Sequence, residues 1–417
     1  MVRLAGTAGT KKIEELANAR GVREGLQFFS REKQWINEQQ LQLCRIPAPT
    51  FLEEERAKWM AAQLTALGWR VEMDGGGNVI ARLDPDRAGP YVALTAHIDT
   101  VLAPRNPEEI SIEPDGKLCG PGVSDNGAGL AALLAVARAI TTSPGIEDLR
   151  SRVLLIANVG EEGEGNLSGM RFVCNKQPLA DLIKAFLVLD GPTTDHITCK
   201  ALESRRFEVS FTGPGGHSWS DHGIGNPIHA LSRAIAFFTD DPANEDNSSP
   251  ERVSFNFGLI DGGTSINSIP TTARAKLDIR SECSGKVEEM AVFLSNSVQR
   301  ALDAENERVS RGRLSARIRE IGSRPCGVLP EGSPILSHIL AVDAWLGVRS
   351  HPDCASTDAN IPLSMGIPAI SIGAGGQGGG AHTPSEWFHP DGRELGLKRV
   401  FLTLCALLRD AEVAEAG

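Results

Sequence analysis

Three apolar segments of this chain are predicted β-strands, and histidine or carboxylate side chains stand at the end of each one. The segments with their polar residues are 91–101 with His97 and Asp99, 152–159 followed by Glu161 and Glu162, and 184–189 followed by Asp190. Open α/β sheets bind their ligands at the carboxyl ends of the strands. The sequence therefore predicts an α/β fold in which these side chains gather at one edge of a sheet.

His97 and Asp99 lie two residues apart, so the period of a strand places them on the same face. A metal-binding histidine commonly gives one ring nitrogen to the metal and the other to a carboxylate, and this pair fits that arrangement. Taken alone, such a pair at a strand end is more often an ordinary polar terminus than a metal site. The residues that follow along the chain favour the metal site.

Asp125 and the adjacent glutamates Glu161 and Glu162 extend this set. Asp125 lies on a glycine-flanked loop directly before residues 130–140, which are strong helix formers. Its alternative role is the N-cap of that helix. The two glutamates follow a buried strand, where paired carboxylates are costly unless a cation or a proton compensates their charge. The alternative for them is a solvated acidic turn.

A glycine-rich run, residues 373–380, leads to a second candidate ligand, His382. The resulting set of two imidazoles and three carboxylates is His97, Asp125, Glu162, Asp190 and His382. Zinc accepts nitrogen and oxygen ligands, and one bridging carboxylate can join two metals about 3.5–4 Å apart. Such a pair activates a bound water, whose proton a further carboxylate must accept. Glu161 and Glu162 could divide the roles of base and ligand.

The pattern of the sequence changes near residue 203. Residues 206–212 alternate polar and apolar side chains, as in an antiparallel strand with one exposed face. The strands and helices that follow predict a small α+β domain over 203–322, inserted between 1–202 and 323–417 of the α/β domain.

The N-terminal part of the chain is predicted to be helical over residues 11–45. Thr50 with Glu53 predicts a capping box for the helix that follows.

Charge and cysteine usage exclude several classes of protein. The formal net charge of −11 argues against a nucleic-acid partner. The eight cysteines are scattered, which favours reduced thiols and a cytoplasmic protein over a disulfide framework or a zinc knuckle. The N-terminal residues lack the apolar core of a secretory signal, and no segment is long and apolar enough to predict a membrane span.

The chain resembles the di-zinc exopeptidase and amidohydrolase family that includes peptidase T, glutamate carboxypeptidase and aminoacylase. The similarity extends from about residue 40 over nearly all of the chain, and peptidase T is the most similar branch. The motifs that carry it are, in order, His97-Ile-Asp99, Gly122-Val-Ser-Asp125, Glu161-Glu162-Gly163, Leu189-Asp190-Gly191, Gly213-Pro-Gly-Gly-His217-Ser218, Asn267-Ser-Ile-Pro270 and Gly380-Ala-His382-Thr. Two residues, Asn126 and Gly160, depart from the common pattern, and neither removes a candidate ligand.

The resemblance implies a three-layer α/β/α catalytic domain with an inserted α+β domain that serves as a lid and as the interface of a homodimer. It implies two Zn²⁺ ions per chain, with Co²⁺ or Mn²⁺ as alternatives. The roles implied for the catalytic domain are His97 and Asp190 on one zinc, Glu162 and His382 on the other, Asp125 as the bridge, Glu161 as general base, and Asp99 as the support of His97. In the insert, His217 is implied to stabilise the oxyanion, and Asn267 and Arg280 to bind polar groups of the substrate.

The expected activity is hydrolysis of an amide bond in short peptides, with aminopeptidase action on tripeptides as the first hypothesis. An N-acyl-amino-acid deacylase and a carboxypeptidase are the enzyme alternatives, because the same metals and base cleave each of these amides. Specificity depends on lid loops and pocket shape, which the motifs do not define. A catalytically inactive dimeric binding protein is the remaining alternative, and it predicts the loss of a ligand or of the base.

Overall fold

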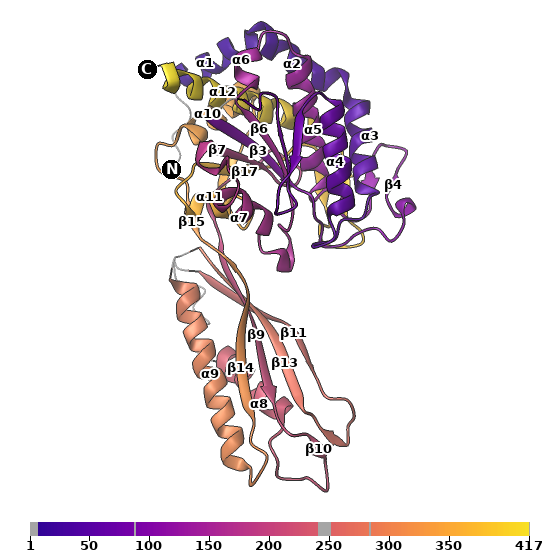
Figure 1. The fold of residues 1–417 in the computed structure, drawn as a ribbon, viewed down its shortest axis with the longest axis vertical. Coiled ribbons are helices and arrows are strands. Elements are labelled where there is room, and N and C mark those ends of the chain that lie inside the picture. The colour runs from indigo at the N-terminus through magenta and orange to yellow at the C-terminus, as the bar shows by residue number, and fades with distance from the viewer. Residues whose placement is uncertain (1–6, 87–88, 241–251, 283–284, 417) are drawn as a thin grey trace. The chain divides into compact units, whose positions relative to one another are not determined.

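The computed structural model describes residues 7–86, 89–240, 252–282 and 285–416, and these divide into two units (Figure 1). The first unit combines Met1–Ala201 with Gly327–Gly417, and the second is Leu202–Cys326. The predicted end of the insert at residue 322 therefore falls inside a strand that continues to Arg324. Among the described residues, no helix combines the length and apolar character that a membrane crossing requires.

The first unit is built on a large mixed sheet. Its strands are β1 (Arg70–Met73), β2 (Val79–Arg82), β3 (Tyr91–His97), β6 (Val153–Asn158), β7 (Ile183–Leu189), β8 (His196–Ala201), β15 (Gly327–Val328), β16 (His351–Ala355) and β17 (Ala369–Ile372). Their order is β1-β2-β6-β3-β7-β17-β8-β15, with β16 paired to β8. The neighbours β6, β3, β7 and β17 run parallel, so their carboxyl ends meet at one edge.

Helices cover this sheet. They are α1 (Thr7–Asn18), α2 (Arg20–Arg31), α3 (Lys33–Cys44), α4 (Glu54–Ala66), α5 (Gly127–Thr142), α6 (Glu147–Arg150), α7 (Ser168–Asn175), α10 (Pro334–Leu346), α11 (Asn360–Ser364) and α12 (Arg393–Ala416). Successive strand residues point to opposite faces, and every residue of β3 is buried, so both faces of the sheet are covered there. Helices α5 and α12 both contact β3. This architecture confirms the predicted α/β class.

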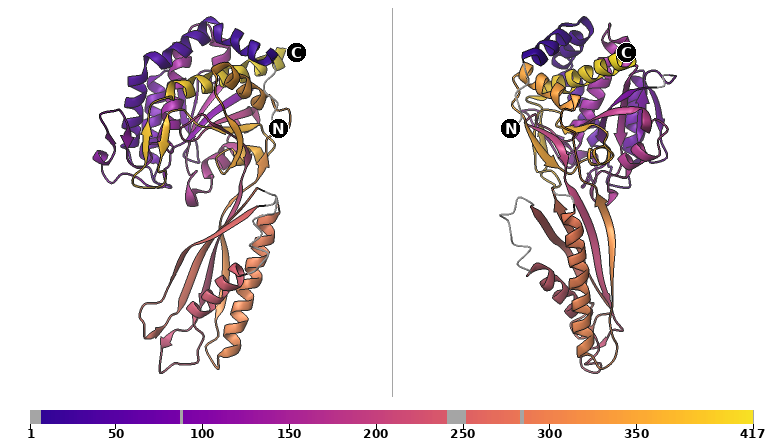
Figure 2. Two further views of the ribbon diagram at one scale, coloured as in Figure 1. Left: turned by 180° about the vertical axis from the view of Figure 1, so that it is seen from behind. Right: turned by 90° about the vertical axis from the view of Figure 1, so that its left-hand side faces the viewer.

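The second unit is an antiparallel sheet packed against helices. Its sheet has the order β11-β13-β9-β14, and its elements are β9 (Glu203–Thr212), β10 (Gly216–His217), α8 (Pro227–Thr239), β11 (Val253–Gly262), β12 (Ser268–Ile269), β13 (Thr272–Ser281), α9 (Lys286–Arg308) and β14 (Ser315–Arg324). Buried residues alternate along β13, as expected for a sheet with one covered face. Helices α8 and α9 contact each other and both pack on β9 and β13 (Figure 2).

Two local features differ from the sequence prediction. The capping box is wrong: helix α4 begins after Glu53, and the Thr50 hydroxyl donates instead to Asp99 Oδ2 at 3.0 Å. Glu53 likewise accepts from the backbone of Gly160 at 3.1 Å, so tertiary contacts occupy both side chains. A small sheet that the pattern did not predict has the order β18-β19-β5-β4. Its strands are β4 (Ser111–Ile112), β5 (Leu118–Cys119), β18 (Gln377–Gly379) and β19 (Trp387–His389).

Candidate metal centre

The parallel strands bring the predicted residues of the first unit to one edge of the sheet. His97 is the last residue of β3, Asp190 directly follows β7, and the glutamates follow the end of β6. His97, Glu161 and Glu162 are buried, and Asp190 is half-buried. Strand β3 lies between β6 and β7 in the sheet, so His97 lies between the glutamates that follow β6 and Asp190, which follows β7.

Asp125 lies between the two histidines. Its Oδ1 is 3.2 Å from His97 Nε2, and its Oδ2 is 3.0 Å from His382 Nε2. Asp190 Oδ1 is 3.9 Å from the same His97 nitrogen, and Glu162 Oε1 is 3.0 Å from the same His382 nitrogen. The five predicted ligands are therefore arranged as two groups that share Asp125.

This arrangement fits a pair of metal ions. One ligand atom from each of His97, Asp125 and Glu162 lies within 4.8 Å of the others. Among the described residues, buried Asp125 Oδ1 accepts no hydrogen bond, although it faces the His97 ring. A buried carboxylate oxygen in this state is costly unless a cation compensates it. Nitrogen and carboxylate oxygen donors are the ligands that zinc and related divalent metals take.

The electrostatics also favour positive charge at this point. Burial opposes the charged form of His97, but Asp125, Asp190 and Asp99 together raise its pKa well above the usual value. Hydrogen bonds to Asp125 and Glu162 raise the pKa of His382 to about 10. Burial raises the pKa of Asp125, but the two histidines outweigh that effect and lower it well below its usual value. These carboxylates therefore stabilise positive charge beside the imidazole rings of His97 and His382.

Asp99 contacts more groups than the sequence indicated. His97 Nδ1 lies 3.0 Å from the Asp99 carbonyl oxygen and 3.5 Å from Oδ1. The carboxylate of Asp99 also accepts from the backbone N–H groups of Glu161 and Glu162, both at 2.9 Å. Strand β3 ends at His97, so the contact with Asp99 arises beyond the strand. Asp99 thus holds the His97 ring and the glutamate backbone in one arrangement.

Asn126, and not Asp125, caps helix α5. The Asn126 side-chain oxygen accepts from Gly129 N at 3.1 Å and from Gly191 N at 3.2 Å, and its amide donates to Leu189 O at 2.8 Å. The peptide bond between Asp125 and Asn126 is cis. The alternative role of Asp125 as N-cap is therefore wrong, and its carboxylate faces the histidines instead. Asn126 also ties the Asp125 loop to the end of β7.

Replacing Asn126 by alanine is expected to lower the free energy of unfolding of the metal-free protein by about 3 kcal/mol. The helix cap contributes about 1 kcal/mol, and the loss of each hydrogen bond to Leu189 O and Gly191 N costs about 1 kcal/mol more. Urea denaturation measures this loss. Asn175→Ala is the control, since Asn175 makes one exposed hydrogen bond to Arg171 O. A loss no larger than that of the control would show that Asn126 does not hold this loop.

The predicted residues of the insert lie in the second unit. His217 is on β10, and its Nδ1 accepts from Trp219 N at 3.2 Å and Ser220 N at 3.3 Å. In the neutral ring, the proton is therefore on the exposed Nε2. Asn267 is brought beside His217, because its carbonyl oxygen accepts from Ser218 N at 3.0 Å. Arg280 lies on β13 and donates from Nε to Asp278 Oδ2 at 2.6 Å.

Sequence reasoning missed two buried carboxylates in the first unit. Glu386 accepts three backbone hydrogen bonds from the loop that carries Asp125. Asp358 is fully buried, accepts from Asn158 Nδ2 at 2.7 Å, and has a pKa that burial raises to about 7. Glu386 lies four residues after the predicted ligand His382, and this short separation could have marked it as a candidate site residue. Asp358 follows no strand with a recognisable pattern, so no signal pointed to it.

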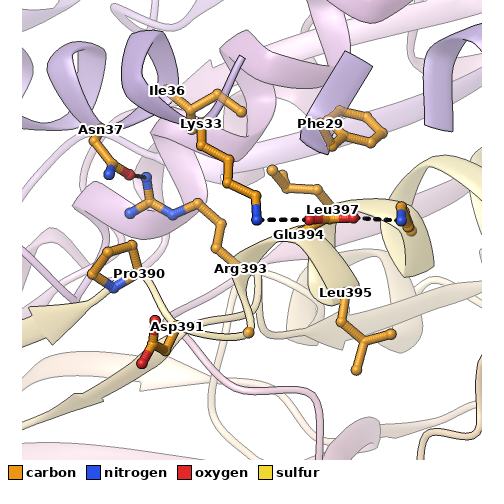
Figure 3. A pocket seen from close by; sticks show the side chains of 12 residues that line it. Phe29, Lys33, Ile36, Asn37, Pro390, Asp391, Arg393, Glu394, Leu395 and Leu397 are labelled. Atoms are coloured by element: carbon orange, nitrogen blue, oxygen red, sulfur yellow. Dashed lines mark hydrogen bonds and ion pairs between the residues drawn. The ribbon is translucent and has the colours of Figure 1, made fainter. Parts of the chain in front are cut away.

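Pockets occur in both units away from the five predicted ligands. A pocket of about 360 Å³ lies beside the start of α12. Figure 3 shows Arg393 directed toward Asn37, and Lys33 toward Glu394. Arg393 also donates to Gln40, whose amide donates to Val123 O at 2.5 Å in the Asp125 loop. In the second unit, a pocket of about 810 Å³ lies beside β10 and β12.

Comparisons with known proteins identify the family to which this chain is similar. The model of peptidase family M20/M25/M40 matches residues 93–406. The chain is 27% identical over 340 residues to a succinyl-diaminopimelate desuccinylase of Corynebacterium glutamicum, covering 80% of this chain and 86% of the relative. It is also 27% identical over 270 residues to the enzyme of that name from Granulibacter bethesdensis, covering 62% and 69%.

Solved structures share the fold. A tripeptidase from Staphylococcus aureus has a TM-score of 0.69 at 17% identity, over 90% of this chain and 98% of that one. The dipeptidase Dug1p from Saccharomyces cerevisiae has a TM-score of 0.71 at 14% identity, over 94% and 99%. At these identities the similarity establishes the architecture, while the chemistry must be argued from the residues of this chain.

Proposed function

The chain belongs to peptidase family M20/M25/M40 and is a hydrolase of amide bonds, and we propose that it cleaves short peptides at a site with two metal ions. The proposed ligands are His97 and Asp190 for one metal, Glu162 and His382 for the other, and Asp125 between them. The observation that carries the proposal is the position of Asp125, whose two oxygens lie 3.2 and 3.0 Å from the Nε2 atoms of His97 and His382.

The chemistry that such a pair supplies is a bound water of lowered pKa and a polarised substrate carbonyl. We assign the general base to Glu161, which would accept the proton of that water and deliver it to the leaving amine. The contact between Glu162 and His382 supports giving the ligand role to Glu162 and the base role to its neighbour. Asp99 positions both glutamates through their backbone N–H groups.

The proposed roles in the second unit are substrate binding and stabilisation of the oxyanion. His217 suits the oxyanion, because backbone donors occupy Nδ1 and leave the proton on exposed Nε2. Asn267 lies beside it and can bind a polar group of the substrate. We assign Arg280 to a substrate carboxylate, since a guanidinium can bind such a group bidentately. Its ion pair with Asp278 would orient the guanidinium.

The second unit is also the proposed interface of a homodimer. Strand β11 is an edge of its sheet, and edge strands can pair with another chain. Leu259 and Ile260 on this strand are exposed apolar side chains, which a partner would cover. The cytoplasmic location stays a prediction, supported by the free thiols of the described cysteines.

A substrate panel tests the proposed activity. Purified protein reconstituted with Zn²⁺, Co²⁺ or Mn²⁺ is assayed on free-amine tripeptides beside N-acetyl and N-succinyl amino acids, with the metal content measured in the same sample. We expect cleavage of the tripeptides from the amine end at two metals per chain. The same preparation of the Glu161→Ala variant controls for contaminating peptidases.

The names of the relatives suggest a deacylase as the alternative to a peptidase. The two sequence relatives are named as desuccinylases, whereas the two solved structures are a tripeptidase and a dipeptidase. Activity on the acylated amino acids alone would reject the aminopeptidase hypothesis and support a deacylase with the same metal ligands. Cleavage from the carboxyl end would support a carboxypeptidase. No hydrolysis of any substrate at two metals per chain would reject the proposed substrate classes.

A further inference from the structure

Glu386 is a buried carboxylate outside the proposed set of ligands and base. It lies just before β19 and is 3% exposed. Its Oε2 accepts from Gly122 N at 2.7 Å, and its Oε1 accepts from Ser124 N and Asp125 N, both at 2.8 Å. One side chain therefore holds three backbone N–H groups of the loop that carries the shared ligand.

The geometry indicates that Glu386 is ionised. Both carboxylate oxygens face N–H donors, whereas a protonated carboxyl would direct its own O–H toward one of them. Hydrogen bonds to a charged acceptor contribute more to stability than hydrogen bonds between neutral groups. Burial lowers the pKa of the nearby Arg56 guanidinium, and the carboxylates of Asp99 and Glu386 oppose that shift. A buried cation thus offsets part of the cost of these buried anions.

The segment that contains Glu386 also carries His382. Within it, Thr383 N donates to Gly380 O at 3.1 Å and Glu386 N to Thr383 O at 3.3 Å, so these residues form consecutive turns. His382 contacts the Asp125 carboxylate at 3.0 Å, and Glu386 accepts from the Asp125 backbone at 2.8 Å. The same short segment therefore holds Asp125 through its side chain and through its main chain.

The opposite side of the loop is held by a neutral group. Gln40 donates to Val123 O, and Arg393 donates to Gln40 from the wall of the pocket in Figure 3. Glu386 and Gln40 thus fix the loop from its N–H groups and from its carbonyl group, respectively. The Glu386 carboxylate lies next to Asp125, so its charge would add to the negative potential at the proposed metal site.

We propose that Glu386 is a positioning residue that sets the separation of Asp125 from His382 and thereby the affinity of the site for its metals. The inference rests on the proposed two-metal function. It assigns Glu386 no contact with substrate or metal. Its effect is exerted through the backbone of Gly122, Ser124 and Asp125 and through the turn that leads back to His382.

The test is the Glu386→Gln variant, which preserves shape but offers one acceptor oxygen in place of two. Its amide N–H₂ would face a backbone N–H, so the loop would shift. We expect metal affinity to fall by about 10–100-fold, the usual effect of residues that orient metal ligands. Competition with a chelator measures this for Zn²⁺, and the absorption spectrum of the Co²⁺ protein reports altered coordination. At saturating metal, kcat should fall while KM stays within about threefold of wild type.

Matched variants separate positioning from general stability. Glu394→Gln makes the same chemical change on α12, where Glu394 pairs with Lys33 and Lys398, and should leave metal affinity unchanged. Glu386→Asp keeps the charge but shortens the side chain, so it should also weaken metal binding. It tests the inference if the Glu386→Gln variant does not fold. Circular dichroism and thermal melting of the metal-free proteins monitor the fold.

The outcomes distinguish this inference from the proposed function. Wild-type protein that binds no metal would overturn the proposed function itself. Wild-type protein with two metals, beside Glu386 variants of equal metal affinity and an unchanged Co²⁺ spectrum, would overturn the positioning role alone. Loss of metal affinity only in parallel with loss of circular dichroism would also overturn it, because Glu386 would then serve folding in general.

Discussion

Glu161→Ala is expected to lower kcat by about 10²–10⁴-fold, the usual contribution of a general base, while both metals stay bound. Glu161 is buried beside the proposed ligand Glu162, and its backbone N–H donates to Asp99. Removal of its carboxylate would take away the proposed proton acceptor for a water that the metals would activate. The backbone contact with Asp99 does not depend on the side chain, so the ligands should keep their positions.

Steady-state kinetics and metal analysis of the same sample test this prediction. Glu164→Ala is the control, because Glu164 is an exposed glutamate three positions further along the chain. The control should keep wild-type kcat. A Glu161→Ala enzyme with normal turnover would refute the base assignment. Loss of one metal from this variant would show instead that Glu161 is the ligand and that the two glutamates have exchanged roles.

Asp125→Ala is expected to remove metal from both positions. Asp125 Oδ1 faces His97 and Asp125 Oδ2 faces His382, so a single substitution takes one ligand from each group. Changes in residues that only orient ligands already cost about 10–100-fold in metal affinity, and loss of a shared ligand should exceed that range. Activity should fall below detection at metal concentrations that saturate the wild type.

Metal titration by calorimetry, with stoichiometry from elemental analysis, checks this result. Asp181→Ala controls for removal of an acidic residue, since Asp181 is exposed near the start of β7. Retention of two metals at wild-type affinity would contradict the shared role of Asp125. Loss of one metal only would place Asp125 in one group and require another bridge.

The sequence predicted the parts of the fold that depend on local pattern. Apolar runs predicted β3, β6 and β7, because buried parallel strands are made of consecutive apolar residues. Helix α5 followed from its strong helix formers. The parallel pairing of these strands places His97, the glutamates and Asp190 at one edge, which is why a list of strand ends could serve as a list of candidate ligands.

The same reasoning failed for side chains whose partners are distant in sequence. Thr50 has the spacing of a capping box with Glu53, yet its hydroxyl contacts Asp99, 49 residues away. Asp125 and Asn126 are both plausible caps by residue type, and the packing of the loop against β7 selects Asn126. A local rule gives the set of possible partners, but the fold decides which of them is within reach.

By itself, the sequence determined the α/β class and predicted the inserted unit and the set of candidate ligands, because periodicity and motif spacing are properties of neighbouring residues. The tertiary structure decided how those ligands are held. Glu386 and Gly122 are 264 residues apart, and Asp358 and Asn158 are 200 apart. These hydrogen bonds form because folding brings residues that are distant in sequence into contact. Polar groups in the buried interior are stable only when they are hydrogen-bonded.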